Sequence, residues 1–212
     1  RIVNAEGQRE KMATRKGTIV LLQDVLKAAI DRVHEIIADR DWDAEKKERI
    51  ARSVGIGAVI FNDLSRTRTK DIDFNLQQML DFDPETKAFK GETGPYLQYT
   101  HARLSSALRK YGKPVAGDVN FALLATDDDK GVARQVGRFP QIVFDAATRY
   151  EPSIVSRFLI DLSGEVNRFW KHQRILSDDA AMTAARILLV ASARHVLKFG
   201  LTLLGIEAPE EM

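Results

Sequence analysis

A run of cations stands near the start of the sequence. The segment KMATRKG, residues 11–17, contains Lys11, Arg15 and Lys16, and Arg9 precedes it. Together with the backbone N–H groups of a loop that ends in glycine, these side chains could neutralise a polyphosphate, as in sites of phosphoryl or adenylyl transfer. The spacing alone does not identify such a site, because basic loops before helices are usually solvated surface. Both interpretations stay open on these residues.

A second cationic region lies between residues 130 and 174. It contains eight Lys and Arg residues and only four acidic residues. Affinity for phosphate depends on clustered cations rather than on the sum over a chain, so this region is a candidate surface for a nucleic-acid backbone. The formal net charge of +2 does not by itself indicate such a partner. The eight cations are Lys130, Arg134, Arg138, Arg149, Arg157, Arg168, Lys171 and Arg174.

Helical periodicity predicts the elements that position the first cations. Apolar residues recur at steps of three and four over 20–39, which indicates an amphipathic helix directly after the basic loop. A second helix is predicted from Asp43, a suitable N-cap, to about Phe61. The segment GIG at 55–57 lacks the third glycine and the preceding strand of a phosphate-binding turn. We therefore expect its glycines to permit close helix packing.

The stretch 62–92 loses this periodicity. It is rich in polar, Pro and Gly residues, and we expect irregular structure or short strands that link two bodies. A domain boundary is placed near Gly94, which gives predicted domains over 1–93 and 94–212.

The second body is predicted to be an all-α bundle. Its first helix should carry Pro95 at its first position, where a missing N–H costs nothing. The acidic residues that open the next helix should complement the positive end of the helix dipole. The bundle helices are expected over 95–111, from Asp127 with an interruption at Gly137 and Pro140, from Pro152 onward, and from a cap at Ser177 or Asp178 to about Leu204.

Composition narrows the class of protein. A hydrophobic fraction of 44% with 29% charged residues is ordinary for a soluble globular protein, and we expect no membrane partner. The sequence has no Cys and no signal-peptide pattern, so a cytoplasmic location is expected. The four His residues are scattered without the i, i+4 spacing of a metal site, so no protein metal site is expected.

Several of these segments together resemble one known family. KMATRKG is similar to the KMSKS signature loop of class I aminoacyl-tRNA synthetases, in the form that arginyl-tRNA synthetases often show. The stretches VGIGAVIFNDLSRTR (54–68), GETGPYLQYTHARLSSALRK (91–110) and ARHVLKFGLTLLGIEAPEEM (193–212) also resemble arginyl-tRNA synthetases in order and spacing. The resemblance implies a mainly α chain: a helical DALR anticodon-binding domain preceded by the helical C-terminal tail of a Rossmann-type catalytic domain.

The resemblance also implies that the first loop serves ATP. Lys11 aligns with the first signature lysine and Arg15 with the second, so both are expected to act on ATP phosphates during catalysis. Met12 and Lys16 complete the candidate ATP-binding loop, while Ala13 replaces the usual serine. In the full-length family enzyme, ATP with Mg would drive the attachment of arginine to its tRNA.

Other parts of such an enzyme are not found upstream of Lys11. A HIGH-type motif and an arginine pocket are missing, and the sequence begins abruptly at RIVNAEG. We expect a C-terminal fragment of a longer, monomeric enzyme, inactive by itself and without a bound cofactor, because such a site needs groups from several strand ends. The alternative is a non-catalytic helical RNA-binding or assembly module that keeps a vestigial loop.

Recognition of the tRNA anticodon would use aromatic residues that stack on unpaired bases and cations that meet the backbone. Met212 matches the terminal methionine that the resemblance places near the anticodon loop. A role in the helical core stays open for Phe169, which follows Val166 at helical spacing. The other candidates are Tyr96, Gln98, Tyr99, His101 and Arg103 on the first bundle helix, and Asn167 and Trp170 on a later one.

Overall fold

The computed structural model describes residues 2–3, 9–10, 21–70 and 75–212, and within these ranges the chain is mainly helical, as predicted. Strand β1 pairs antiparallel with β2, and β3 pairs antiparallel with β4. The elements are β1 (Ile2–Val3), β2 (Arg9–Glu10), α1 (Leu22–Ile36), α2 (Ala44–Leu64), α3 (Leu76–Met79), β3 (Phe82–Asp83), β4 (Ala88–Phe89), α4 (Gly94–Tyr111), the 3₁₀ turn η2 (Phe121–Leu123), α5 (Asp127–Arg149), α6 (Ser153–His172) and α7 (Ala180–Leu203).

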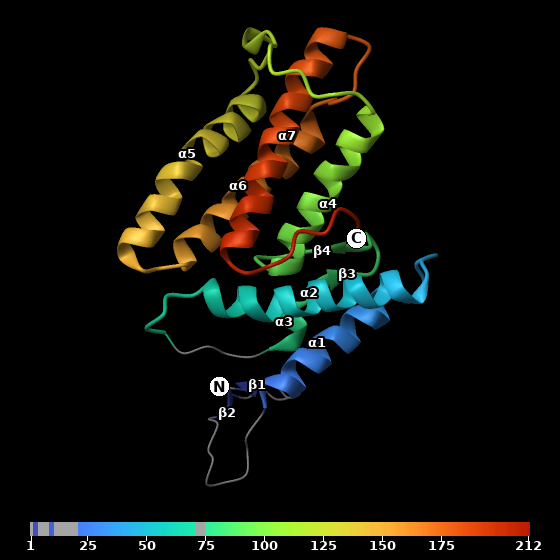
Figure 1. The fold of residues 1–212 in the computed structure, drawn as a ribbon, viewed down its shortest axis with the longest axis vertical. Helices are drawn as coiled ribbons and strands as arrows, with labels where there is room; N and C mark the ends of the chain where they lie inside the picture. Colours follow the sequence, from blue (N-terminus) through green and yellow to red (C-terminus); the bar gives the residue numbers. More distant parts are fainter. Residues whose placement is uncertain (1, 4–8, 11–20, 71–74) are drawn as a thin grey trace.

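Helices α4, α5, α6 and α7 stand side by side and form the predicted bundle (Figure 1). Its core combines Leu, Val, Ile, Phe and Ala side chains, and Leu159, Leu162, Leu197 and Leu201 are completely buried. Burying one such side chain stabilises the folded state by about 1.5–3 kcal/mol. Burial of these apolar side chains is therefore the main interaction that holds the four helices together.

The first bundle helix begins and ends where its sequence requires. The Thr93 hydroxyl accepts a hydrogen bond from the Tyr96 N–H at 3.2 Å, which satisfies one donor that a helix start leaves unpaired. Pro95 is the second residue of α4, one position later than predicted. The helix ends at Gly112, whose φ of 66° lies in the left-handed region that glycine adopts without strain.

Helices α1 and α2 lie across one end of the bundle (Figure 1). Asp43 caps α2 as predicted, since its carboxylate accepts from the Lys46 N–H at 2.7 Å. A Cβ on Gly55 would lie 2.8 Å from the backbone nitrogen of Ile30, and a Cβ on Gly94 would lie 2.7 Å from the carbonyl oxygen of Gly57. The prediction that the GIG segment permits close helix packing is confirmed.

Two apolar clusters divide the described residues. One lies within the bundle, and the other joins α1 and α2 to the β3–β4 hairpin. Phe61 of α2 belongs to the bundle cluster, and the side chain of Tyr96 packs against both clusters. Helix α2 therefore connects the two bodies, while the domain boundary near Gly94 stays a prediction.

Two expectations about the bundle are wrong. Helix α5 continues through Gly137 and Pro140 instead of breaking there. Pro140 is exposed, so water can solvate the carbonyl that the ring leaves unpaired, and Phe139 beside it is buried against Phe158 with ring centroids 5.6 Å apart. The last helix is capped by Asp179 and not by Ser177 or Asp178, and the Asp179 carboxylate accepts from two backbone N–H groups.

Helix α7 is long and apolar enough to cross a membrane, judged by length and composition alone, with a mean hydropathy of 1.3 over its most apolar window. Half of that window is buried in this structure. Its apolar character serves the bundle core here, because α7 packs against α4, α5 and α6.

Candidate nucleic-acid interface

Four of the predicted site residues form one connected group between α4 and α6. The Asn167 amide nitrogen donates to the Tyr96 hydroxyl at 2.7 Å, and the Arg103 guanidinium donates to the Asn167 carbonyl oxygen at 3.4 Å. The same guanidinium lies over the Trp170 ring, with its central carbon 4.5 Å from the ring centroid. All four side chains are half-buried, so each keeps a face toward solvent.

The stacked pair of Arg103 and Trp170 can meet both parts of a nucleotide. Burial lowers the pKa of the Arg103 guanidinium, but arginine stays charged in proteins, so the cation remains available to phosphate. Cation–π contact contributes about 0.5–2 kcal/mol and fixes the plane of the indole. A cavity of about 370 Å³ opens beside the pair, and its other lining residues are Ser106, Ala107, Lys110, Gln173, Ile175 and Leu176. Lys110 was not among the predicted residues, although its spacing of seven from Arg103 places it on the same helix face.

Three predicted RNA contacts are corrected by the structure. Gln98 and His101 are completely buried, and Phe169 is 1% exposed. A side chain without exposed surface cannot stack on a base, so these residues do not contact RNA in this conformation. Phe169 belongs to the bundle core, the alternative that its spacing had left open.

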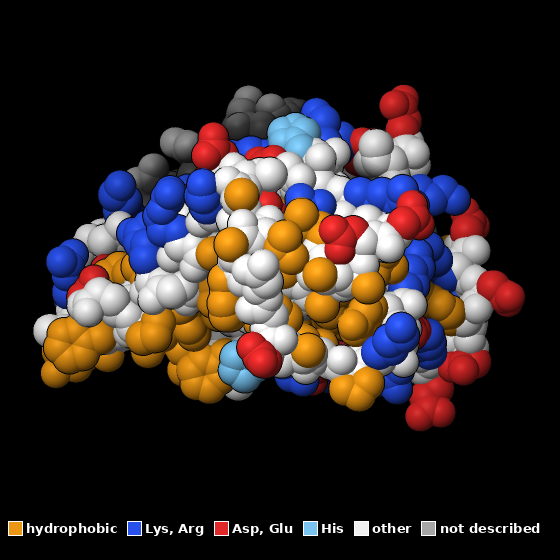
Figure 2. All heavy atoms as spheres, turned by 90° about the horizontal axis from the view of Figure 1, so that it is seen from above, with side chains coloured by type: hydrophobic (Ala, Val, Ile, Leu, Met, Phe, Trp, Pro, Cys, Tyr) orange, Lys and Arg blue, Asp and Glu red, His pale blue; other side chains and the backbone are white. Residues whose placement is uncertain are grey.

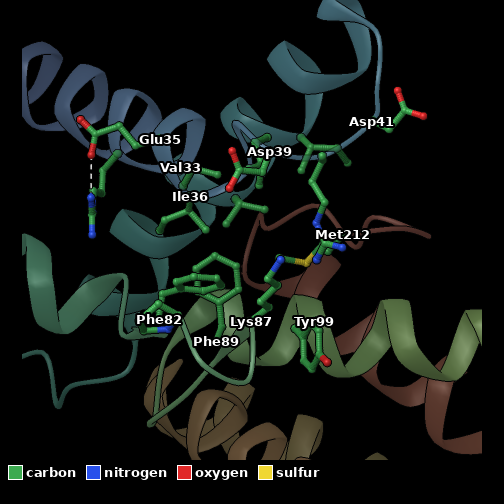
Figure 3. A pocket seen from close by; sticks show the side chains of 16 residues that line it. Val33, Glu35, Ile36, Asp39, Asp41, Phe82, Lys87, Phe89, Tyr99 and Met212 are labelled. Atoms are coloured by element: carbon green, nitrogen blue, oxygen red, sulfur yellow. Dashed lines mark hydrogen bonds and ion pairs between the residues drawn. The ribbon is translucent and has the colours of Figure 1, made fainter.

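Two further predicted residues, Tyr99 and Met212, lie in a different cavity from Arg103 and Trp170. They line a cavity of about 510 Å³ together with α1 and the β3–β4 hairpin. Figure 3 shows Met212 and Tyr99 on one side of this cavity and Phe82 and Phe89 on the other, with the side chain of Lys87 between them. Trp170 and Met212, both predicted RNA contacts, therefore line different cavities, and Tyr96 packs against both apolar clusters.

The cations of residues 130–174 all lie on the surface. Seen from the end of the bundle, hydrophobic side chains gather along one side of the molecule and Lys and Arg side chains occupy other parts of the same view (Figure 2). Arg157, Arg168 and Arg174 pair with acidic residues at 2.8, 3.2 and 3.6 Å. The charge of this region is thus partly compensated on the protein itself.

The predicted ATP loop lies outside the described residues. Lys11, Met12, Arg15 and Lys16 were assigned from sequence resemblance, and their roles stay predictions.

The geometry described here is that of a helical bundle with a half-buried, cation-bearing aromatic site. The sequence model of the DALR anticodon binding domain matches residues 97–212, and that of the catalytic domain of class I tRNA synthetases, arginine type, matches residues 3–76. The chain therefore belongs to the DALR anticodon-binding domain family, joined to part of a class I synthetase catalytic domain.

Curated relatives of this chain are arginine–tRNA ligases. The arginine–tRNA ligase of Alkaliphilus metalliredigens is 42% identical over 210 residues, which are 99% of this chain and 36% of that protein. The arginine–tRNA ligase of an Exiguobacterium species is 44% identical over 208 residues, 96% of this chain and 34% of that protein. This chain thus spans about a third of the length of these curated relatives.

Solved structures agree on the fold. The arginyl-tRNA synthetase of Thermus thermophilus superposes with a TM-score of 0.81 at 32% identity, over 91% of this chain and 32% of that one. The arginyl-tRNA synthetase of Plasmodium falciparum gives a TM-score of 0.74 at 20% identity over 92% of this chain and 34% of that one, a likeness of fold alone.

Proposed function

We propose that this chain is the tRNA-recognising portion of an arginine–tRNA ligase, and that the group between α4 and α6 contacts unpaired bases of the anticodon loop. The observation that carries the proposal is the Arg103 guanidinium held over Trp170 on a half-buried surface, within the region that matches the anticodon-binding family. Single-stranded RNA is generally bound by aromatic and guanidinium planes, on which its bases stack.

The proposal predicts a large effect at Trp170. Replacing Trp170 with Ala should weaken binding of an arginine-tRNA anticodon stem-loop by about 1–3 kcal/mol, because one base loses its stacking partner. The measurement is a fluorescence or calorimetric titration at fixed salt, since contacts to phosphate weaken as salt rises. A stem-loop with an unrelated anticodon serves as the reference ligand.

A matched control is available in the same chain. Trp42 also carries a cation over its ring, the Lys46 ammonium at 4.8 Å, and it is also half-buried, but it lies before α2. Trp42→Ala should leave the affinity for the stem-loop unchanged. Equal affinity for the cognate and the unrelated stem-loop would contradict anticodon recognition. An equal loss of affinity in Trp170→Ala and Trp42→Ala would show that Trp170 makes no specific contact with the stem-loop.

We further propose that Lys11 and Arg15 bind the phosphates of ATP, with Mg, in the complete enzyme. The support is the resemblance of residues 11–17 to the synthetase signature loop and the match of residues 3–76 to the catalytic family. In this proposal the loop holds the polyphosphate and stabilises charge that develops during adenylate formation.

The test of the ATP loop uses a chimaera that joins this chain to the part of the Alkaliphilus enzyme that it does not span. Lys11→Ala should depress the turnover of arginine activation far more than the affinity for tRNA, because the lost contact acts on the reacting phosphates. Lys27→Ala, at an exposed lysine of α1, is the control. If the turnover of arginine activation is unchanged in the Lys11→Ala chimaera, Lys11 does not bind the ATP phosphates.

A further inference from the structure

The segment Ile206–Met212 folds back along α4 after α7 ends, and the C-terminus lies close to the β3–β4 hairpin (Figure 1). Two completely buried side chains of α4 form hydrogen bonds with the backbone of this segment. The Gln98 amide nitrogen donates to the carbonyl oxygen of Glu207 at 2.8 Å, and His101 Nδ1 lies 2.9 Å from the carbonyl oxygen of Pro209. We call Ile206–Met212 the tail.

The imidazole of His101 has only one way to make this contact. A carbonyl oxygen accepts but does not donate, so Nδ1 must carry the proton. The other ring nitrogen, Nε2, is buried and has no hydrogen-bond partner among the described residues. Burial also lowers the pKa of His101, which favours the neutral ring. The protein therefore holds this histidine as a neutral donor aimed at the tail.

Space for the Gln98 contact comes from a glycine on α2. A Cβ on Gly57 would lie 2.9 Å from the Gln98 amide nitrogen and 3.1 Å from a side-chain carbon of Ile206. The amide nitrogen also donates to the carbonyl oxygen of Ser53 at 3.1 Å. One buried amide thus joins α2, α4 and the tail.

Charged contacts hold the far end of the tail. The Arg109 guanidinium donates to the carbonyl oxygen of Glu210 at 3.0 Å, and Lys46 pairs with Glu211. The Lys46 ammonium also holds the pKa of Glu211 below its usual range. These contacts lead the chain to Met212, which lines the cavity beside Tyr99.

We propose that Gln98 and His101 are positioning residues that fix the tail and so place Met212 beside Tyr99 at the edge of the RNA-binding surface of α4. Both residues were expected to touch RNA, but their burial assigns them to the backbone of their own chain. The part of this proposal that concerns RNA rests on the proposed function. The part that concerns Met212 stands on the hydrogen bonds alone.

The wild-type chain provides the first test. In protein labelled with ¹⁵N-histidine, the resonances of His101, assigned with a variant, should report the Nδ1–H tautomer at neutral pH. An Nε2–H tautomer or a charged ring would overturn the proposal, because neither matches a buried donor at Nδ1 alone.

The second test follows the methyl group of Met212, one of four methionine methyls in the chain. Met212 packs against the apolar cluster of α1 and α2, so its resonance should differ from that of an exposed methionine. His101→Leu should move it to the position of an exposed methionine while the methyl of Met79 in the α1–α2 cluster stays in place. His101→Asn, whose amide can donate where Nδ1 did, should restore the wild-type shift.

Controls separate this role from a general loss of structure. His195→Leu changes an exposed histidine of α7 and should leave Met212 unmoved. If His101→Leu shifts the Met79 resonance as well, the same measurement is made on Gln98→Leu, which removes the amide donor without adding a methionine methyl. An unmoved Met212 methyl in folded Gln98 and His101 variants sinks the proposal.

The stem-loop titration tests the part that concerns RNA. A detached tail must be ordered again on binding, so a folded His101→Leu chain should lose about fivefold in affinity. Wild-type affinity with a displaced Met212 methyl would refute the RNA role of the tail. If the wild-type chain fails to bind any stem-loop, the proposed function fails, while the tautomer and the methyl shift still test how the tail is held.

Discussion

Replacing Arg186 with Met is expected to lower the free energy of unfolding by about 3–5 kcal/mol, because it leaves a buried carboxylate without its cation. Arg186 Nε lies 3.3 Å from the carboxylate of Asp129, which is completely buried. The guanidinium also donates to the carbonyl oxygen of Arg174 at 3.0 Å and to the side chain of Gln173 at 2.7 Å. Urea denaturation followed by circular dichroism measures the loss.

The second carboxylate oxygen of Asp129 is bound within the first turn of α5 and holds the carboxylate in its buried place. It accepts from the hydroxyl of Thr126 at 2.6 Å and from the Thr126 N–H at 3.2 Å, which closes the capping box of α5. A neutral Asp129→Asn change in the Arg186→Met background should recover part of the stability, since the unpaired buried charge disappears.

An exposed arginine supplies the control. Arg174 pairs with Asp178 at 3.6 Å on the surface, and Arg174→Met should cost at most about 1 kcal/mol. If Arg186→Met costs no more than Arg174→Met, the buried pair does not hold α5, α6 and α7 together in the way described.

Gly55→Ala is expected to destabilise the chain by about 3 kcal/mol, at the upper end of the usual cost of overpacking. The added Cβ would lie 2.8 Å from the backbone nitrogen of Ile30 and 2.9 Å from the carbonyl carbon of Ala29. Backbone atoms inside a helix cannot move aside one at a time, so α1 must shift away from α2. Thermal or chemical unfolding measures the effect.

Gly137→Ala is the matched change in open space. Apart from its chain neighbours and the nearby backbone of its own helix, no atom of the described residues lies within 4 Å of the Cβ position at Gly137, which sits on the exposed side of α5. Alanine there should raise the stability by about 0.5–1 kcal/mol, because it restricts the unfolded chain and favours the helix. A similar response at both positions would show that helix propensity, and not the α1–α2 contact, decides the outcome at Gly55.

Local signals in the sequence were sufficient for the elements. Periodicity and caps such as Asp43 act within one or two turns, so they predicted the long helices to within a few residues. The break expected at Pro140 failed because packing of the neighbouring Phe139 outweighs a local preference. Tertiary contacts routinely override weak propensities in this way.

The candidate site depended more strongly on tertiary structure. The sequence placed Tyr96, Arg103, Asn167 and Trp170 on two helices, and packing of α4 against α6 brought them together. It could not tell them from Gln98 and His101, because the same residue types serve RNA stacking and buried hydrogen bonds equally well. Exposure decides between the two roles, and exposure is a property of the assembled fold.

By itself, then, the sequence determined the family, the helical class and most helix ends to within a few residues, since these follow from motifs and from contacts between neighbouring residues. Only the tertiary structure decided that Asp129 is the buried partner of Arg186 and that the tail lies along α4. The partners in these pairs stand 57 and 108 positions apart in the chain, and such distant pairings are set by how whole helices pack against one another.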